Sequence, residues 1–233
     1  MSRDNAPPLL ATDLEGIILP EIWIAVAKKT GIDELKSTTR DVADYDELMQ
    51  TRLAVLRHHG LTIHDIQSVI ATMDLLPGAA DFLLWARRIM PLIIITDSYY
   101  ELINPFAAQL SYATAFAHNL IVDTDGTITG YRLRVQYSKR LALRSFRQLG
   151  FRTVAIGDSY NDIAMLREAH LGLLFNAPEN VHDDYPQFAT TTSYDELRES
   201  IRAYLKLPLP DRNTESGGIA QTHDNEGVGG ITS

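Results

Sequence analysis

Two short segments of this 233-residue chain carry acidic pairs whose spacing suits chemistry at phosphorus. The first is Asp13-Leu14-Glu15-Gly16. An Asp carboxylate at the end of a strand can attack phosphorus and form an aspartyl-phosphate. In an extended chain Glu15 points to the same side as Asp13, so it can exchange a proton with the leaving or entering oxygen. A lone Asp at such a position is more often a turn or capping residue, so this segment decides nothing alone.

The second segment, Gly-Asp-Ser-Tyr-Asn-Asp (157–162), predicts a metal site. Asp158 and Asp162 are four residues apart at an expected helix N-terminus, so they share a face. Two carboxylates close to Asp13 repel one another unless a cation lies among them, and Mg²⁺ prefers such hard oxygen ligands. The alternative is an N-cap Asp followed by a solvated helical Asp.

Three further residues suit a bound phosphate group. The Thr96 hydroxyl and the Asp97 backbone amide can donate hydrogen bonds to phosphate oxygens, the amide at an expected helix start. Lys139 can neutralise phosphoryl charge and hold Asp13 beside it. Taken alone, each residue has an ordinary alternative interpretation: Thr96 as a threonine at the end of a strand, and Lys139 as a solvated lysine on a helix. Their joint occurrence with the two acidic segments, in a consistent order, favours a phosphoryl-transfer site.

The elements that must position these residues predict an α/β fold with a doubly wound parallel sheet. Apolar runs at 9–11, 92–95 and 154–156 precede three of the segments and indicate buried strands. Ligands bind beyond the carboxyl ends of such strands, where the segments would converge. An Asp-Gly turn predicts a hairpin over 119–134. Amphipathic stretches predict helices that begin at Pro20 and that lie at 44–59, 62–73, 79–90, 99–110, 138–149 and 161–169. A further strand is expected at 171–175.

The order of these elements predicts a core with an insertion. Residues 1–16 and 76–206 are expected to form the core. Residues 17–75 carry three successive helices and are expected to form a helical cap beside the strand ends, because ordinary α/β loops are far shorter. Residues 207–233 are poor in apolar side chains and are expected to form a disordered tail.

Composition excludes several classes of function. The net charge of −9 argues against broad binding to nucleic acid or to an anionic membrane. The chain has no cysteine, which removes disulfides, thiolate metal sites and cysteine nucleophiles. Neither a secretory leader nor an apolar run long enough to span a bilayer is present, so a cytoplasmic protein is expected.

The motifs DLEG, TDS, a lone Lys139 and GDSYND resemble the four motifs of the haloacid dehalogenase superfamily of phosphotransferases. The stretches 13–32, 38–53 and 157–170 resemble its phosphoserine phosphatase branch, and similarity extends from about Leu10 to Tyr204. The resemblance implies Mg²⁺-dependent hydrolysis of phosphoserine, with homoserine as a second phosphoryl acceptor. It leaves monomer and homodimer both open. Two rival readings are a phosphatase for another small metabolite and a catalytically silent binding protein.

The resemblance also implies a role for individual residues. Asp13 is then the nucleophile and Glu15 the general acid and base, with Mg²⁺ held by the Asp13 carboxylate, the Glu15 backbone carbonyl and Asp158. Most members of the branch carry Asp at the position of Glu15 and Ser at that of Thr96, so both positions depart from the pattern. In the cap, Glu21 and Arg52 align with the residues that bind the substrate's ammonium and carboxylate. The residues implied to line the phosphate and substrate pocket are Thr96, Asp97, Lys139 and Asn161.

Overall fold

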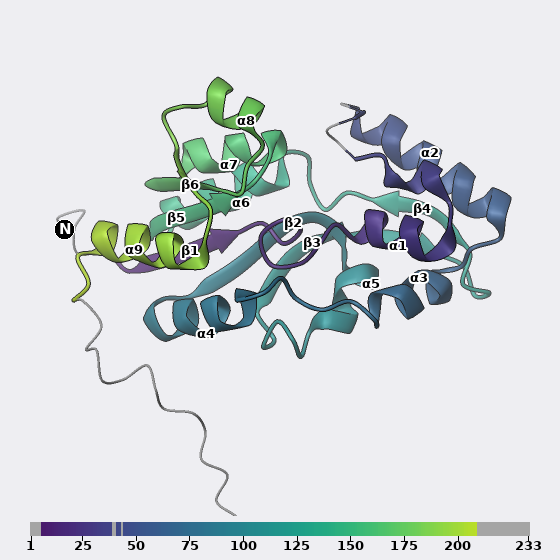
Figure 1. The fold of residues 1–233 in the computed structure, drawn as a ribbon, viewed down its shortest axis with the longest axis horizontal. Helices are drawn as coiled ribbons and strands as arrows, with labels where there is room; N and C mark the ends of the chain where they lie inside the picture. The colour runs from purple at the N-terminus through teal and green to yellow at the C-terminus, as the bar shows by residue number, and fades with distance from the viewer. Residues whose placement is uncertain (1–5, 39–40, 43, 209–233) are drawn as a thin grey trace, which may run out of the picture.

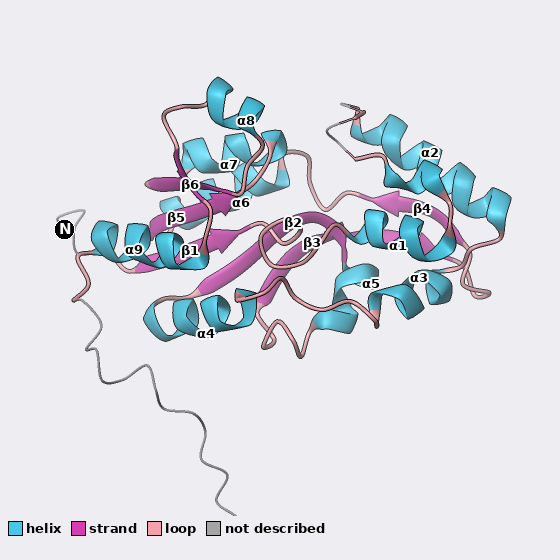
Figure 2. Ribbon diagram, in the orientation of Figure 1, coloured by secondary structure: helices cyan, strands magenta, loops and turns pink. Residues whose placement is uncertain are grey.

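A computed structural model describes residues 6–38, 41–42 and 44–208, which fold around one seven-stranded sheet (Figures 1 and 2). The strand order is β4-β3-β2-β1-β5-β6-β7, and every neighbouring pair is parallel except β3 and β4. The expected doubly wound α/β fold is therefore confirmed. The strands are β1 (Pro8–Thr12), β2 (Leu92–Tyr99), β3 (Thr114–Val122), β4 (Ile128–Arg132), β5 (Arg152–Gly157), β6 (Leu171–Phe175) and β7 (Ala189–Thr191).

Helices cover both faces of the sheet because successive strand residues point to opposite sides. Leu10 and Ile94 pack with α4 and α9 on one face, whereas Leu9 and Ile93 pack with α6, α7 and α8 on the other. Figure 1 shows these two layers on either side of the strands. The helices are α1 (Ile22–Thr30), α2 (Tyr45–His59), α3 (Ile63–Ile70), α4 (Ala79–Ile89), α5 (Tyr100–Ile103), α6 (Ser138–Gln148), α7 (Ile163–Glu168), α8 (Glu179–Asp184) and α9 (Tyr194–Leu205).

The segment between β1 and α4 carries α1, α2 and α3, as the sequence predicts, and lies at one end of the sheet (Figure 1). Its two ends meet where the Leu76 N–H donates to the Ile18 carbonyl at 2.9 Å. Local signals explain its helices: Asp44 caps α2, and Thr62 with Asp65 forms a capping box on α3. Its apolar residues join the cluster that covers one face of the sheet. The division into core and cap stays a prediction.

The predicted hairpin is confirmed, and it contacts the cap. β3 pairs with β4 across a turn that contains Gly126, and the Gly126 carbonyl accepts a hydrogen bond from Ile63 N–H of α3 at 2.8 Å. On β4, the Tyr131 ring packs edge-on against Tyr45 of α2, with 6.0 Å between their centroids. The edge of the sheet formed by β4 therefore contacts both α2 and α3.

One predicted helix is wrong. The expected helix over 99–110 is replaced by the short α5 and a 3₁₀ turn (Asn104–Phe106), because Tyr99 stays extended to pair with His118 and Pro105 supplies no N–H donor. The β2 strand continues through Thr96 to Tyr99, with an irregular register after Ile95. The Asp97 amide therefore lies within a strand irregularity and not at a helix start, which corrects the predicted setting.

The chain continues after β6, the last element that the sequence predicted. It forms α8, β7 and α9, of which β7 extends the sheet, although the sequence indicated no element there. Residues 209–233 of the predicted disordered tail lie outside the described residues. Among the described residues, no helix is long and apolar enough to cross a membrane.

Candidate active site

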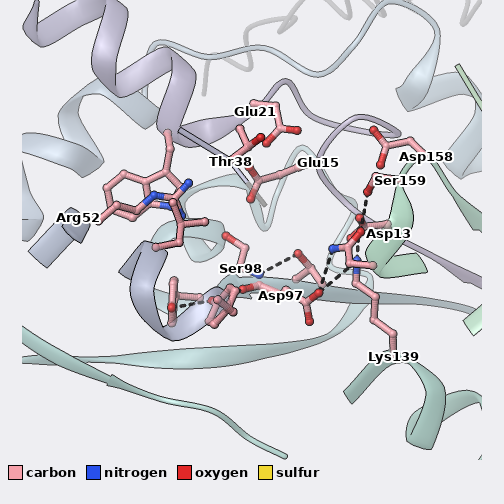
Figure 3. A pocket seen from close by; sticks show the side chains of 16 residues that line it. Asp13, Glu15, Glu21, Thr38, Arg52, Asp97, Ser98, Lys139, Asp158 and Ser159 are labelled. Carbon is pink, nitrogen blue, oxygen red and sulfur yellow. Dashed lines mark hydrogen bonds and ion pairs between the residues drawn. The ribbon is translucent and has the colours of Figure 1, made fainter. Parts of the chain in front are cut away.

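A pocket opens at the carboxyl ends of β1, β2 and β5 and is covered by α1 and α2 of the cap (Figure 3). Asp13, Lys139 and Asp158 lie toward one end, Arg52 lies at the other, and Glu15 lies between them. Every predicted site residue except Asp162 lines this pocket. The lining residues are Asp13, Glu15, Glu21, Trp23, Thr38, Tyr45, Leu48, Arg52, Thr96, Asp97, Ser98, Tyr99, Lys139, Asp158, Ser159 and Asn161.

A buried lysine organises the acidic end. Lys139 is 4% exposed, and its Nζ lies 2.9 Å from Asp13 Oδ2, 2.8 Å from Asp162 Oδ1 and 3.5 Å from Asp97 Oδ2. Burial lowers the pKa of Lys139, but these three carboxylates outweigh burial and hold the pKa well above its ordinary value. The ammonium is therefore charged and directed at Asp13.

Both oxygens of the Asp13 carboxylate have a partner. Its Oδ1 accepts the N–H of Leu14 at 2.8 Å, while Oδ2 contacts Lys139. Burial raises the pKa of Asp13 well above its ordinary value, and the neighbouring carboxylates of Asp162 and Asp158 add to this while Lys139 opposes it. A positive charge beyond that of Lys139 would stabilise the ionised carboxylate.

Asp13, Asp158 and Asp162 form a buried cluster that fits a hard cation. One carboxylate oxygen of each lies within 4.8 Å of the others. Glycine permits this approach: a Cβ at Gly16, where φ is +77°, would lie 2.1 Å from Asp158 Oδ2, and one at Gly157 would lie 2.3 Å from Asp162 Cβ. The cluster suits a divalent ion that prefers oxygen ligands.

Asp162 differs from the other two members of the cluster. It is fully buried behind the pocket, where Oδ1 accepts from Lys139 and Oδ2 accepts from the backbone N–H groups of Asp158 at 2.9 Å and Ser159 at 3.3 Å. Both oxygens are thus engaged in shaping the loop and placing the lysine. The sequence alone did not separate this task from metal binding.

Glu15 connects the loop after β1 to the first turn of α1. Its Oε2 accepts the N–H of Ile22 at 2.9 Å, in the first turn of α1, where helix N–H groups lack partners and the helix dipole favours negative charge. Burial and the nearby Glu21 raise the pKa of Glu15 to about 7, although Ile22 N–H, Ser98 and Arg52 lower it in part. A carboxyl group with this pKa can both give and take a proton near neutral pH.

The far end of the pocket is built around Arg52. This residue is 7% exposed, its guanidinium lies 4.7 Å from the Trp23 ring centroid, and its NH2 group donates to the Ser37 carbonyl at 2.7 Å. Its Nε–H has no hydrogen-bond partner among the described residues. Glu21 lines the same pocket and lies beside Glu15, so one acidic side chain besides Glu15 and one basic side chain line the cavity on this side of Asp13.

Several pocket residues were missed by sequence reasoning. Ser98, Tyr45 and Tyr99 lie on the wall, and Tyr45 OH donates to the Asp97 carbonyl at 2.9 Å and lies 2.7 Å from Tyr99 OH. Ser98 stands two residues after Thr96 in the predicted TDS motif, which is a signal that could have found it. His118 is buried behind Asp97, and no sequence motif marks it.

Comparisons with known proteins agree with this geometry. Residues 13–170 match the family model of haloacid dehalogenase-like hydrolases. The chain is 48% identical to phosphoserine phosphatase ThrH of Pseudomonas aeruginosa, over 83% of this chain and 93% of that protein. It is 45% identical to a phosphoserine phosphatase of Pseudomonas syringae pv. tomato, over 84% of this chain and 83% of that one.

Solved structures match the fold. A phospho-aspartyl intermediate analogue of phosphoserine phosphatase superposes with a TM-score of 0.69 at 21% identity, covering 85% of this chain and 99% of that one. A substrate-bound phosphoserine phosphatase complex gives 0.68 at 20% identity, covering 84% and 98%. At such identities these structures support the fold alone. The family model and the two Pseudomonas relatives carry the assignment: the chain belongs to the haloacid dehalogenase-like hydrolase family, in which it groups with the phosphoserine phosphatases.

Proposed function

We propose that this hydrolase removes the phosphate of phosphoserine through an aspartyl-phosphate on Asp13. The observation that carries the proposal is one continuous pocket with a phosphoryl-transfer end and an amino-acid end. Asp13 and Lys139 lie at the first, Arg52 lies at the second, and Glu15 lies between them with Glu21 beside it. Phosphoserine requires these three regions, because its ester oxygen lies between a phosphate and a zwitterion.

The proposed chemistry uses the Asp13 and Glu15 carboxylates in two steps. One Asp13 oxygen attacks phosphorus, the bond to the serine oxygen breaks, and that oxygen takes the proton of Glu15. Water then attacks the aspartyl-phosphate, Glu15 takes the water's proton, and Asp13 is released with inorganic phosphate. A pKa of about 7 suits Glu15 to both steps.

The remaining groups hold the phosphoryl charge. Lys139, the Thr96 hydroxyl, the Asp97 amide and the Asn161 side chain are proposed to contact phosphate oxygens. The Asp13 carboxylate, the Glu15 backbone carbonyl and Asp158 would hold Mg²⁺, while Asp162 places Lys139. When bound, the ion would offset the negative charge that gathers on the transferred group.

The amino-acid end gives the proposal its substrate. The buried Arg52 side chain lines the pocket, and a buried charge is costly to leave without an anionic partner. A substrate carboxylate would satisfy it, and Glu21 would bind the ammonium group.

A substrate panel tests the proposal. Phosphate release is measured with Mg²⁺ for phosphoserine, phosphothreonine, phosphoethanolamine and p-nitrophenyl phosphate, and phosphoserine is expected to give the highest kcat/KM. Higher kcat/KM for a substrate that lacks the carboxylate would indicate a phosphatase for another small metabolite. No turnover of any of them would indicate a silent binding protein.

Transfer of the phosphoryl group to homoserine is a second candidate activity, favoured by the buried Ser98 hydroxyl. The Ser98 side chain lies close enough to Glu15 to lower the pKa of Glu15, yet its hydroxyl has no hydrogen-bond partner among the described residues. An acceptor alcohol held there would meet the same base that activates water, at high effective concentration. Phosphorus NMR of a phosphoserine reaction with added homoserine should show O-phosphohomoserine rising as inorganic phosphate falls. If inorganic phosphate is the only product at saturating homoserine, the simple phosphatase stands.

A further inference from the structure

The Asp97 side chain has contacts that its proposed amide role does not require. Its carboxylate meets groups from three separate parts of the chain. Oδ2 accepts from Asn161 Nδ2 at 3.0 Å and lies 3.5 Å from Lys139 Nζ, while Oδ1 accepts from Ser138 Oγ at 3.3 Å. Burial raises the pKa of Asp97, but Lys139, His118 and Asn161 lower it more, so the group is ionised. Asp97 therefore joins two groups of the phosphate pocket.

His118 completes the surroundings of this carboxylate. It lies on β3 opposite Tyr99, is 3% exposed, and its Nε2 lies 3.6 Å from Asp97 Oδ1. Its Nδ1 accepts the backbone N–H of Arg134 at 3.0 Å, so Nδ1 carries no proton. The ring proton is therefore on Nε2 and faces Asp97.

The division of contacts between the two oxygens suggests what His118 does. A carboxylate can rotate about its terminal bond, which has a broad energy minimum. His118 and Ser138 hold Oδ1 on the side of the hairpin and α6, which leaves Oδ2 directed at Lys139 and Asn161. Lys139 in turn lies 2.9 Å from the Asp13 oxygen. A continuous line of contacts thus runs from β3 to the proposed nucleophile.

We propose that His118 is a positioning residue for phosphoryl transfer, which orients the Asp97 carboxylate so that Lys139 and Asn161 are held in the phosphate pocket. This inference rests on the proposed function in taking Lys139 and Asn161 as phosphate ligands. It adds a residue that acts on them through Asp97, beside the placement of Lys139 by Asp162, and it links the β3–β4 hairpin to the catalytic centre.

Two substitutions separate this role from packing. His118→Gln keeps an N–H donor near the position of Nε2 and loses the acceptor for Arg134, whereas His118→Asn keeps an acceptor near Nδ1 and loses the donor to Asp97. We expect His118→Asn to lower kcat for phosphoserine about tenfold, because Asp97 loses its contact with the Nε2 proton and Lys139 loses its alignment, with KM changed less than about threefold. His118→Gln should retain most of kcat. A purely structural His118 would give equal losses in both variants, and that result would overturn the proposal.

His170 supplies a matched control. It also accepts a backbone N–H at Nδ1, from Thr153 at 3.1 Å, but it does not line the active-site pocket. His170→Asn and His170→Gln should therefore differ little in kcat. Thermal unfolding of all four variants identifies any that are not folded at the assay temperature.

Crystal structures of the two His118 variants decide the question independently of activity. In His118→Asn, Lys139 Nζ should move away from its 2.9 Å contact with Asp13 Oδ2, and in His118→Gln it should stay. An unchanged Lys139 in both would refute the positioning role. If the wild-type protein hydrolyses p-nitrophenyl phosphate but not phosphoserine, the proposed substrate fails, while kcat for p-nitrophenyl phosphate still compares the variants.

Discussion

Replacing Arg52 by alanine removes the guanidinium that is proposed to bind the substrate carboxylate. The side chain is buried and carries an unpartnered Nε–H that faces no described acceptor. Losing a hydrogen bond to a charged group typically costs about 1.5 to 3 kcal/mol. Since about 1.4 kcal/mol is a factor of ten in rate, kcat/KM for phosphoserine should fall roughly 10- to 150-fold.

The matched substrate is phosphoethanolamine, which has the ammonium and the phosphate of phosphoserine but lacks the carboxylate. Its kcat/KM should change by less than about threefold in Arg52→Ala, because phosphoethanolamine has no carboxylate that could lose a contact with Arg52. Phosphate release at fixed Mg²⁺ measures both substrates. Arg52→Lys keeps the charge but loses the planar fork, so its loss should be intermediate.

Folding must be checked in the same experiment, because Arg52 also stacks on Trp23 and donates to the Ser37 carbonyl. These contacts predict a fall of about 1 to 2 kcal/mol in the free energy of unfolding, measured by urea titration. Arg57→Ala is the control, since Arg57 is exposed on the same helix and does not line the active-site pocket. Equal losses of kcat/KM for phosphoserine and phosphoethanolamine would falsify the assignment of Arg52 to the carboxylate.

Three further predictions concern the acidic end and the cap. Asp13→Asn should lower kcat by about a thousandfold or more while phosphoserine still binds, because an amide cannot form the acyl-phosphate; appreciable turnover would contradict the nucleophile. Glu15→Gln should change how stability depends on pH in the metal-free protein. The raised pKa of Glu15 means that the wild type loses stability relative to the variant as pH rises from 4.5 through about 7. The loss in free energy of unfolding approaches about 3 kcal/mol, and urea titrations of both proteins at pH 5 and 8 measure it. If the difference between wild type and Glu15→Gln does not vary with pH, the raised pKa of Glu15 is contradicted. Tyr45→Phe removes the hydroxyl that donates to the Asp97 carbonyl and should lower the free energy of unfolding by about 1 kcal/mol, whereas unchanged urea unfolding would show that this contact adds nothing.

Local pattern explains why much of the fold was predictable. The β6 strand coincides with the predicted run 171–175, and α2 and α3 begin at the capping residues Asp44 and Thr62. The failure over 99–110 has a tertiary cause. Tyr99 is drawn into the sheet by pairing with β3, and that pairing depends on a strand more than ten residues away. Local propensity carries no information about such a contact.

The sequence by itself determined the residue types of the site and the order in which they occur. Asp13, Glu15 and Asp158 follow predicted strands, so their convergence follows from parallel topology, whereas Lys139 lies in the first turn of a predicted helix. Tertiary structure decided which group each side chain meets. Asp162 faces Lys139 and backbone N–H groups behind the pocket, although its spacing from Asp158 reads equally well as a ligand pair.

His118 illustrates the same limit. It lies among apolar residues of a strand, and nothing beside it in the chain marks a function. Its ring reaches Asp97 only because β3 pairs with β2, and its tautomer is set only because the backbone N–H of Arg134 returns to it. Spacing along the chain specifies which residues share a face of one element, whereas contacts between elements depend on how the sheet, the hairpin and the cap pack together.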